Sequence, residues 1–413
     1  MKENVLLIVV DCLRADMVYE RHYDNLNNIR RLIEGGVSFP YAFTSSVTTT
    51  PSFSSILTGL YPARHGVRSL LGYKLNRDIY TLAQILKKHG YYTVAEVTGP
   101  LDPSIGLNRG FDAYNYRDIK VHVYTKWWRN FINSLDKIPQ PWFILLHLLE
   151  LHNPPRIPPG YDRPEYGNTK YERALIALDE KIGELLDKVL SDDVLVIFTG
   201  DHGEYLIETF KQKLNFYTKK AYKGIIRRIA KGPLSFLSKY GRKILIEVGH
   251  GFHVYEVLAR VPLIFYHKKL LPSGVKRYTL ASIVDIFPTV LGALNIDYDI
   301  PYSLDGINLT EIMREGKEIN RWVIIEAAGM RLSEEDRIVS VRTPRYKYIL
   351  WPRKGKEVLY DLLSDPSESK NYIKEKPEIA SQLKDYLLKT YMPHYSEKHK
   401  VTLKIKKLKH RFK

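Results

Sequence analysis

A chain of 413 residues is longer than the roughly 250–300 residues at which a single hydrophobic core stops growing, so we expect one large domain and a smaller one. Its 44% hydrophobic and 26% charged residues are typical of a globular protein and exclude a disordered one. The formal net charge of +17 is concentrated in two segments without acidic residues, Lys211–Lys243 with 11 lysines and arginines and Lys398–Lys413 with 8. The rest of the chain is therefore close to neutral.

The first element in chain order is a short apolar run, Val5–Val10, that stops at Asp11. A membrane span needs roughly 18–20 apolar residues, and no run in the sequence approaches that length. A signal peptide would have a longer apolar stretch and a small-residue cleavage site, so we predict a buried strand instead. We therefore expect a cytoplasmic protein that can associate peripherally with a membrane.

Short apolar runs then alternate with helical patterns through the first three hundred residues. The expected strands are Val5–Val10, Tyr92–Val97, Phe143–Leu146, Val194–Phe198 and Leu263–Phe265, and the expected helices are Leu82–His89 and Tyr171–Leu190. This alternation predicts an α/β fold with a mostly parallel central sheet between two layers of helices. From about Arg321 the pattern changes to closely spaced strands at Trp322–Glu326, Ile338–Arg342 and Tyr346–Leu350, followed by a helix near Pro377–Tyr391. The chain is therefore expected to end in a small α+β domain.

Two of the expected strands run directly into acidic residues, Asp11 in one case and Asp201-His202 in the other. In parallel sheets, ligands bind at the carboxyl ends of strands, so these side chains are expected to meet. Two carboxylates and an imidazole suit Mn²⁺, Zn²⁺, Mg²⁺ or Ca²⁺. Taken alone, Asp201 could instead cap the next helix; together with Asp11 it predicts a metal site.

Hydroxyl residues precede Pro51 in the segment Val47–Gly59, a pattern that marks the start of a helix. The free N–H groups and positive dipole of that end suit a phosphate or sulfate. A threonine at this point is a candidate nucleophile if a metal lowers the pKa of its hydroxyl, and otherwise a helix cap.

Several motifs in the same order along nearly the whole chain resemble those of the sulfatase family of the alkaline phosphatase superfamily. They are Asp11–Asp16, Thr49–Ser52, Leu57–Pro62, His65-Gly66, Gly106–Asp112, Gly249–Gly251, Tyr255–Ile264, Arg342–Tyr348, Leu359–Leu362 and Asp365-Pro366. The resemblance implies an alkaline phosphatase-like α/β/α sandwich and a metal-dependent hydrolase of sulfate or phosphate esters.

Three residues depart from the family pattern. In sulfatases the nucleophile arises from a Cys or Ser that is converted to formylglycine in the motif Cys/Ser-x-Pro-x-Arg, where this chain has Thr49 and, at the arginine position, Phe53. Threonine cannot form that aldehyde, and a threonyl ester must be resolved by attack at phosphorus or sulfur, which favours phosphoesters. Family members with threonine here, such as lipoteichoic acid synthases and phosphoethanolamine transferases, handle phosphodiesters. The third departure is Cys12, where sulfatases usually have a second aspartate.

The resemblance implies one divalent ion (Mn, Zn, Ca or Mg) held by Asp11, Thr49, Asp201 and His202. It also implies that His152 contacts the substrate, and that His250 binds its anionic group or protonates the leaving oxygen. The remaining substrate-binding candidates are His147, which could instead only support its neighbours, and Thr98, which with Gly99 occupies a pocket-lining position in relatives.

A basic insert at residues 207–247 separates the motif at Asp201 from that at His250. Aromatic and aliphatic residues interleave with the lysines and arginines of 211–243, a pattern that fits either an anionic membrane surface or a solvated helix. We expect the membrane role, with the tail at 398–413 contributing, and no nucleic acid partner because no nucleic-acid module is recognised. Deleting 211–243 should then weaken cosedimentation with anionic vesicles; unchanged binding would refute the membrane role.

The sequence thus predicts a sulfatase-like catalytic domain at 1–320 that contains the insert, a C-terminal α+β subdomain at 321–395 and a basic tail at 396–413. We expect a phosphodiester or phosphoester hydrolase that acts through Thr49 and a covalent intermediate. Two alternatives remain open at this point: a phosphoryl-group transferase acting on lipid- or glycan-linked phosphodiesters, and a non-catalytic anion-binding module.

Overall fold

The computed structural model describes residues 2–190, 193–206, 250–327, 329 and 337–394. The basic insert and the basic tail therefore lie outside the described residues. Within these ranges, no helix is both long enough and apolar enough to cross a membrane.

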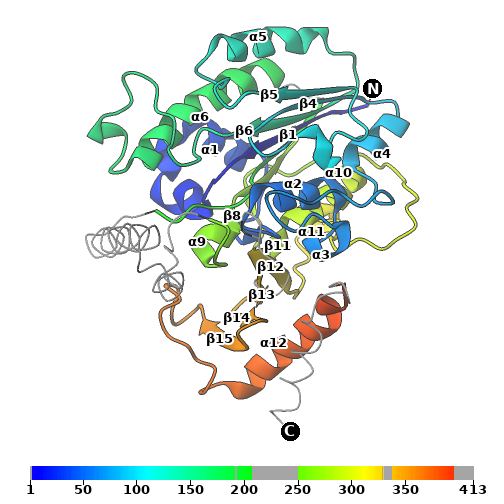
Figure 1. Cartoon of the computed structure of the whole chain (residues 1–413). Coiled ribbons are helices and arrows are strands. Elements are labelled where there is room, and N and C mark those ends of the chain that lie inside the picture. Colours follow the sequence, from blue (N-terminus) through cyan, green and yellow to red (C-terminus); the bar gives the residue numbers. More distant parts are fainter. Residues whose placement is uncertain (1, 191–192, 207–249, 328, 330–336, 395–413) are drawn as a thin grey trace, which may run out of the picture.

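The centre of the molecule is an eight-stranded sheet with the order β10-β2-β9-β7-β1-β6-β4-β5. Figure 1 labels β1, β6, β4 and β5 of this sheet. Five adjacent strands of this sheet are parallel: β1 (Asn4–Val10), β4 (Tyr92–Thr98), β5 (Ala113–Arg117), β6 (Trp142–Leu148) and β7 (Val194–Gly200). The other edge is formed by β9 (Leu263–Tyr266), β2 (Val37–Ser38) and β10 (Val275–Lys276), and β9 is antiparallel to β7. Because β1, β6 and β7 are parallel neighbours, residues that follow their carboxyl ends meet at one edge of the sheet.

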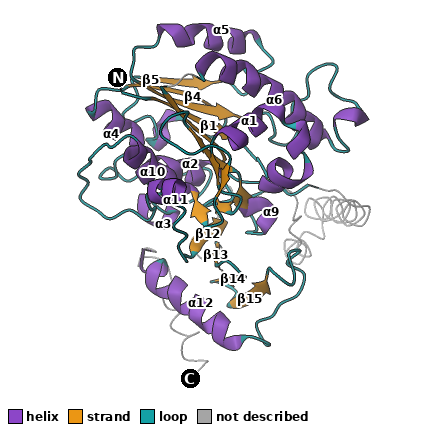
Figure 2. Ribbon diagram, turned by 180° about the vertical axis from the view of Figure 1, so that it is seen from behind, coloured by secondary structure: helices purple, strands orange, loops and turns teal. Residues whose placement is uncertain are grey.

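Helices cover both faces of this sheet (Figures 1 and 2). One layer contains α1 (Asn27–Gly35), α5 (Lys126–Ser134) and α6 (Lys170–Val189); the other contains α2 (Thr49–Thr58), α4 (Leu82–Lys88), α10 (Ile286–Ala293) and α11 (Thr310–Glu315). Strand β1 is buried throughout, and its residues alternate between the two cores. Val5, Leu7 and Val9 pack with the α2 layer, and Leu6, Ile8 and Val10 pack with the α6 layer.

The expected α/β/α fold is confirmed. Each of the five expected strands lies within an observed strand, and the two expected helices differ from α4 and α6 by one residue at an end. The sequence pattern does not predict β5, an edge strand whose residues are mostly exposed or half-buried and so lack an apolar run.

A second, antiparallel sheet follows in the order β12-β13-β14-β15. Its strands are β12 (Val323–Ala327), β13 (Ile338–Arg342), β14 (Tyr346–Trp351) and β15 (Lys356–Asp361). One face packs on α12 (Pro377–Thr390). The other face packs on α9 (Glu256–Ala259) and on a small sheet of β3 (Ala42–Phe43), β8 (Arg260–Val261) and β11 (Ala281–Ser282). A short helix, α3 (Pro62–His65), follows α2.

Strand β12 also pairs with the loop that leads into α2. The backbone N–H of Glu326 donates to Ser45 O at 2.9 Å, and its carbonyl accepts from Val47 N at 3.1 Å. The C-terminal sheet therefore holds the chain two residues before Thr49, the first residue of α2.

The side chain of Glu326 is completely buried in an ion cluster. Its carboxylate accepts hydrogen bonds from Arg68 Nη2 at 2.5 Å and Tyr391 OH at 2.6 Å, and it lies 3.5 Å from Arg337 Nε. Burial alone would raise the pKa of this carboxyl, but the charges of Arg68 and Arg337 lower it overall. Both arginines are buried as well, and both pair with the carboxylate of Glu326.

Replacing Glu326 with Gln should destabilise the protein by about 3–5 kcal/mol, because two buried arginines lose their counter-charge. Urea unfolding at neutral pH measures this. Since the pKa of Glu326 is lowered by folding, its contribution is present above the ordinary glutamate pKa of 4.5 and is lost as pH falls below it. Wild type should therefore lose stability more steeply than the variant as the pH falls below about 4.5.

Glu34→Gln is the control, because the Glu34 carboxylate forms exposed contacts, an ion pair with Arg30 and a hydrogen bond from Tyr23 OH. Equal stability losses in the two variants would contradict the assigned role of the buried cluster.

Candidate metal centre

Three adjacent strands deliver the central residues of the site. Val10 of β1 is in register with Gly200 of β7 and with Leu148 of β6. Asp11 and Asp201 therefore follow directly after neighbouring strand ends. Hence the two aspartates expected to meet lie side by side.

The ligand atoms of Asp11, Asp201 and His202 all lie within 4.8 Å of one another, and all three residues are completely buried. Thr49 Oγ1, at the start of α2, is 3.3 Å from Asp11 Oδ2 and 3.3 Å from His202 Nε2. The four residues expected to hold the ion are thus gathered at one point.

Hydrogen bonds orient Asp201 and His202 so that one acceptor atom of each side chain is left free toward the other ligand atoms of the cluster. Asp201 Oδ1 accepts from the backbone N–H groups of Cys12 (3.1 Å) and His202 (2.7 Å). Asp201 Oδ2 is buried, accepts no hydrogen bond from the residues the structure describes, and lies 3.3 Å from His202 Nε2. His202 Nδ1 donates to Gly203 O at 2.9 Å, which leaves Nε2 with its lone pair, as in many metal-binding histidines.

The two buried carboxylates and the neutral imidazole of the cluster favour binding of a cation. Among the described residues, neither aspartate forms an ion pair with a lysine or arginine. Burial and the charge of Asp11 raise the pKa of Asp201 well above its usual range. Burial opposes ionisation of Asp11 too, but its pKa is lowered overall by a hydrogen bond from His147 and by nearby histidines. Burial lowers the pKa of His202 to about 3, so its imidazole is neutral, which is the form that binds metals. An oxygen and nitrogen donor set of this kind fits a divalent ion.

His250 and His152 lie beside the cluster. The His250 ring is 4.3 Å from that of His202 and 5.3 Å from that of His152, measured between centroids. Glu204 Oε2 lies 3.2 Å from His250 Nδ1. Burial lowers the pKa of His250, but the hydrogen bond and charge of Glu204 outweigh burial and raise it. Glu204 was not singled out by the sequence analysis, although it lies in the same motif as Asp201.

His147 contacts the centre from β6, with Nε2 3.4 Å from Asp11 Oδ2. Phe53, at the arginine position of the family motif, is completely buried and packs edge-on against this imidazole at 4.7 Å. An apolar ring thus occupies the side of His147 that faces α2.

Thr98 ends β4, and its hydroxyl donates to Arg117 O on β5 at 2.9 Å. No contact joins it to the metal cluster among the described residues. The next residue, Gly99, lines a cavity of about 330 Å³ together with Leu70, Leu71, Gly72, Tyr73, Lys74, Pro100, Asp102, Ser104, Ile105 and Tyr116. Thr50 Oγ1 donates to the carbonyls of Leu70 (3.0 Å) and Pro100 (3.4 Å), so this cavity borders the start of α2.

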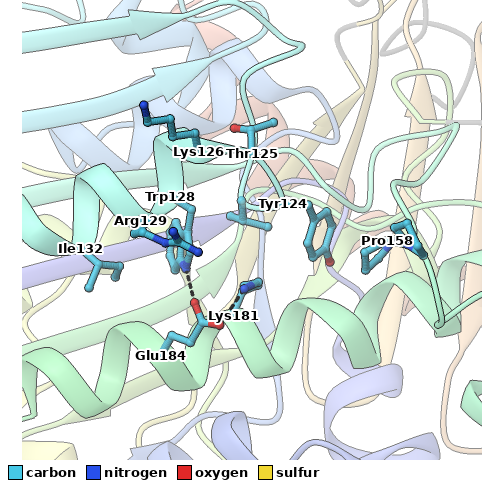
Figure 3. Close-up of a pocket in the computed structure, with 11 residues that line it drawn as sticks. Tyr124, Thr125, Lys126, Trp128, Arg129, Ile132, Pro158, Lys181 and Glu184 are labelled. Carbon is cyan, nitrogen blue, oxygen red and sulfur yellow. Dashed lines mark hydrogen bonds and ion pairs between the residues drawn. The ribbon is translucent and has the colours of Figure 1, made fainter.

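A larger cavity of about 770 Å³ lies between α5 and α6 (Figure 3). Glu184 on α6 accepts hydrogen bonds there from Trp128 Nε1 at 2.8 Å and from Lys181 Nζ at 2.6 Å. The other lining residues are Val123, Tyr124, Thr125, Lys126, Arg129, Ile132, Pro158 and Pro159. None of them belongs to the metal cluster.

Comparison with known proteins links this geometry to characterised enzymes. Residues 3–296 match the family model described as "Sulfatase", and residues 250–392 match "N-sulphoglucosamine sulphohydrolase, C-terminal". Arylsulfatase G of Rattus norvegicus is 23% identical, covering 85% of this chain and 78% of its own length. The fold resembles that of the phosphonate monoester hydrolase of Agrobacterium radiobacter, with a TM-score of 0.70, 19% identity and coverage of 95% of this chain and 96% of that one. It also resembles Ps i-CgsB in complex with k-i-k-neocarrahexaose, with a TM-score of 0.71, 19% identity and coverage of 94% and 92%.

Replacing Asp201 with Asn should raise the melting temperature of the metal-free protein and remove its stabilisation by divalent ions. The amide relieves repulsion between two buried carboxylates, while its oxygen can still accept the bonds from Cys12 and His202. Thermal unfolding with and without added ion measures both effects, since a ligand of the folded state raises the melting temperature.

Asp179→Asn is the matched control, because Asp179 is another buried aspartate whose pKa is raised by burial but which binds the backbone of α1. This variant should keep the metal-dependent stabilisation. If Asp201→Asn kept it as well, Asp201 would not be a ligand.

Proposed function

The chain belongs to the sulfatase family of ester hydrolases, and from this premise we propose that it is a metal-dependent phosphoester hydrolase, acting preferentially on phosphodiesters, with Thr49 as its nucleophile. One observation carries the proposal: Thr49 Oγ1 lies 3.3 Å from both Asp11 Oδ2 and His202 Nε2. A hydroxyl in this position shares the ion that Asp11, Asp201 and His202 would hold.

The bound ion would lower the pKa of the Thr49 hydroxyl and offset the negative charge of the ester oxygens. Thr49 is the first residue of α2, so the N–H groups and positive dipole at that helix end also favour an anionic substrate. Thr49 Oγ1 donates to Asp11 Oδ2, which directs its proton away from an incoming ester. Attack by Thr49 forms a threonyl ester and releases the leaving alcohol.

His250 is suited to protonate that leaving oxygen. The carboxylate of Glu204 raises its pKa, so it holds a proton at a higher pH than an isolated histidine would. His152 lies against His250 and would contact the departing group. Water then attacks the phosphorus of the threonyl ester, breaks its P–O bond to Thr49 and restores the hydroxyl.

The identity of the nucleophile favours phosphorus over sulfur. A formylglycine hydrate can expel sulfate by breaking its own C–O bond, but threonine lacks the second hydroxyl that this route needs. Resolution must therefore occur at the central atom, which is more favourable for phosphoryl than for sulfuryl groups. Phe53 supports the same conclusion, because it replaces the arginine of the formylglycine motif with an apolar side chain that packs on His147. Sulfate esters, such as sulfated sugars, are the competing substrate class, because the matching family models and arylsulfatase G are of sulfatases and a solved relative holds a disulfated glucosamine as its substrate.

Paired aryl phosphodiester, phosphomonoester and sulfate substrates test this proposal with the metal-loaded enzyme. We expect the phosphodiester to have the highest kcat/KM, Thr49→Ala to reduce it at least about 10³-fold and Thr49→Ser to retain part of it. Thr58→Ala is the control, because Thr58 is a buried threonine at the far end of α2 whose hydroxyl donates only to Ser54 O.

Turnover by Thr49→Ala equal to that of Thr58→Ala would refute the nucleophile, and preference for the sulfate ester would refute the substrate class. Adding an alcohol to the phosphodiester assay separates hydrolase from transferase, because only a transferase would convert the alcohol into the main product.

A further inference from the structure

Cys12 is the one cysteine in the sequence, and it follows Asp11 directly. It is completely buried, and its φ of 62° places it in the left-handed region, which a non-glycine residue seldom occupies without a functional reason. Its backbone N–H donates to Asp201 Oδ1 at 3.1 Å. The turn that joins β1 to the rest of the chain is therefore held in a conformation that points the thiol toward the metal centre.

Metal-binding atoms surround the sulfur. Cys12 Sγ lies 2.9 Å from Asp11 Oδ1, 3.6 Å from Glu204 Oε2 and 3.7 Å from His250 Nδ1. The sulfur and a ring nitrogen of each of His202 and His250 all lie within 4.8 Å of one another. His202 therefore belongs both to this group and to the carboxylate group with Asp11 and Asp201.

A buried cysteine often acts only as a small apolar side chain, and one side of Cys12 does pack against the core beneath the sheet. A second observation indicates that Cys12 is more than an apolar core residue. Asp201 Oδ2, itself completely buried, accepts no hydrogen bond from the described residues and lies 3.3 Å from Nε2 of His202, the imidazole that both groups share. An unpartnered carboxylate oxygen and a thiol converge on one imidazole, which is a donor set that a transition-metal ion would complete.

We propose that Cys12 is a thiolate ligand of the ion bound by Asp11, Asp201 and His202, and that it makes the site selective for Zn²⁺ over Ca²⁺ and Mg²⁺. This inference rests on the metal centre of the proposed function. Ca²⁺ and Mg²⁺ take oxygen ligands, whereas Zn²⁺ binds thiolate, imidazole and carboxylate together. On binding, the ion displaces the thiol proton to water and forms a metal–sulfur bond. Relatives with an aspartate at this position would offer an oxygen in place of that sulfur.

Cobalt spectroscopy on the full-length chain tests the proposal, because Co²⁺ reports both its geometry and its sulfur ligands. Metal-free wild type titrated with Co²⁺ should develop visible d–d bands and a near-ultraviolet sulfur-to-cobalt charge-transfer band. With a single cysteine in the chain, that band can arise only from Cys12. Cys12→Ser should bind Co²⁺ with d–d bands and without the charge-transfer band.

Competition between Zn²⁺ and Ca²⁺ gives a second readout. We expect Cys12→Asp to lower the affinity ratio of Zn²⁺ to Ca²⁺ at least about tenfold relative to wild type. If the variants fold poorly, the same question can be answered with the wild-type protein by measuring alkylation of Cys12 during partial denaturation. Zn²⁺ should protect Cys12 from alkylation, and Ca²⁺ should not.

The outcomes separate this proposal from the proposed function. Wild type that binds Co²⁺ without the charge-transfer band would overturn the role of Cys12 and leave the metal centre intact. Wild type that binds neither Co²⁺ nor Zn²⁺ would overturn both.

Discussion

Two buried carboxylates, Asp11 and Asp201, lie side by side at the ends of β1 and β7 without a lysine or arginine partner among the described residues. Their repulsion is costly in a buried site, and either a proton on Asp201 or a cation between them relieves it. The neutral imidazole of His202 completes the same donor set. The register of two parallel strands, set by the apolar residues behind them, is therefore what creates the metal centre.

The position of Thr49 depends on a different part of the chain. Strand β12 pairs with Ser45 and Val47 through the backbone of Glu326, and the buried ion cluster around Glu326 fixes that pairing. The C-terminal sheet therefore holds the entry to α2, which begins at Thr49 beside the candidate metal ligands. The proposed nucleophile and the proposed metal ligands thus come from separate segments, and the C-terminal sheet helps to bring them together.

The sequence alone predicted those site residues that directly follow a recognisable strand. Asp11 and Asp201 were predictable because each ends an apolar run, and parallel strands end at one edge. The contact between Glu204 and His250 was not predictable, because 45 residues separate the two side chains in the sequence and no periodic pattern relates them. The hydrogen-bond partner of Thr98 could not be predicted for a second reason. Its hydroxyl bonds to Arg117 on β5, a strand whose half-exposed residues lack the apolar pattern that reveals a strand. Family motifs supplied what the local patterns could not, namely that these segments belong to one site.

The proposed reaction passes through a covalent intermediate on Thr49. Acid quenching during turnover of a phosphodiester, followed by mass spectrometry of peptides, would detect this intermediate. We expect a phosphoryl ester on the peptide that contains Thr49, at Thr49 itself, and none in Thr49→Ala. An adduct on a different side chain, or turnover that proceeds with no covalent adduct and with inversion at phosphorus, would contradict it.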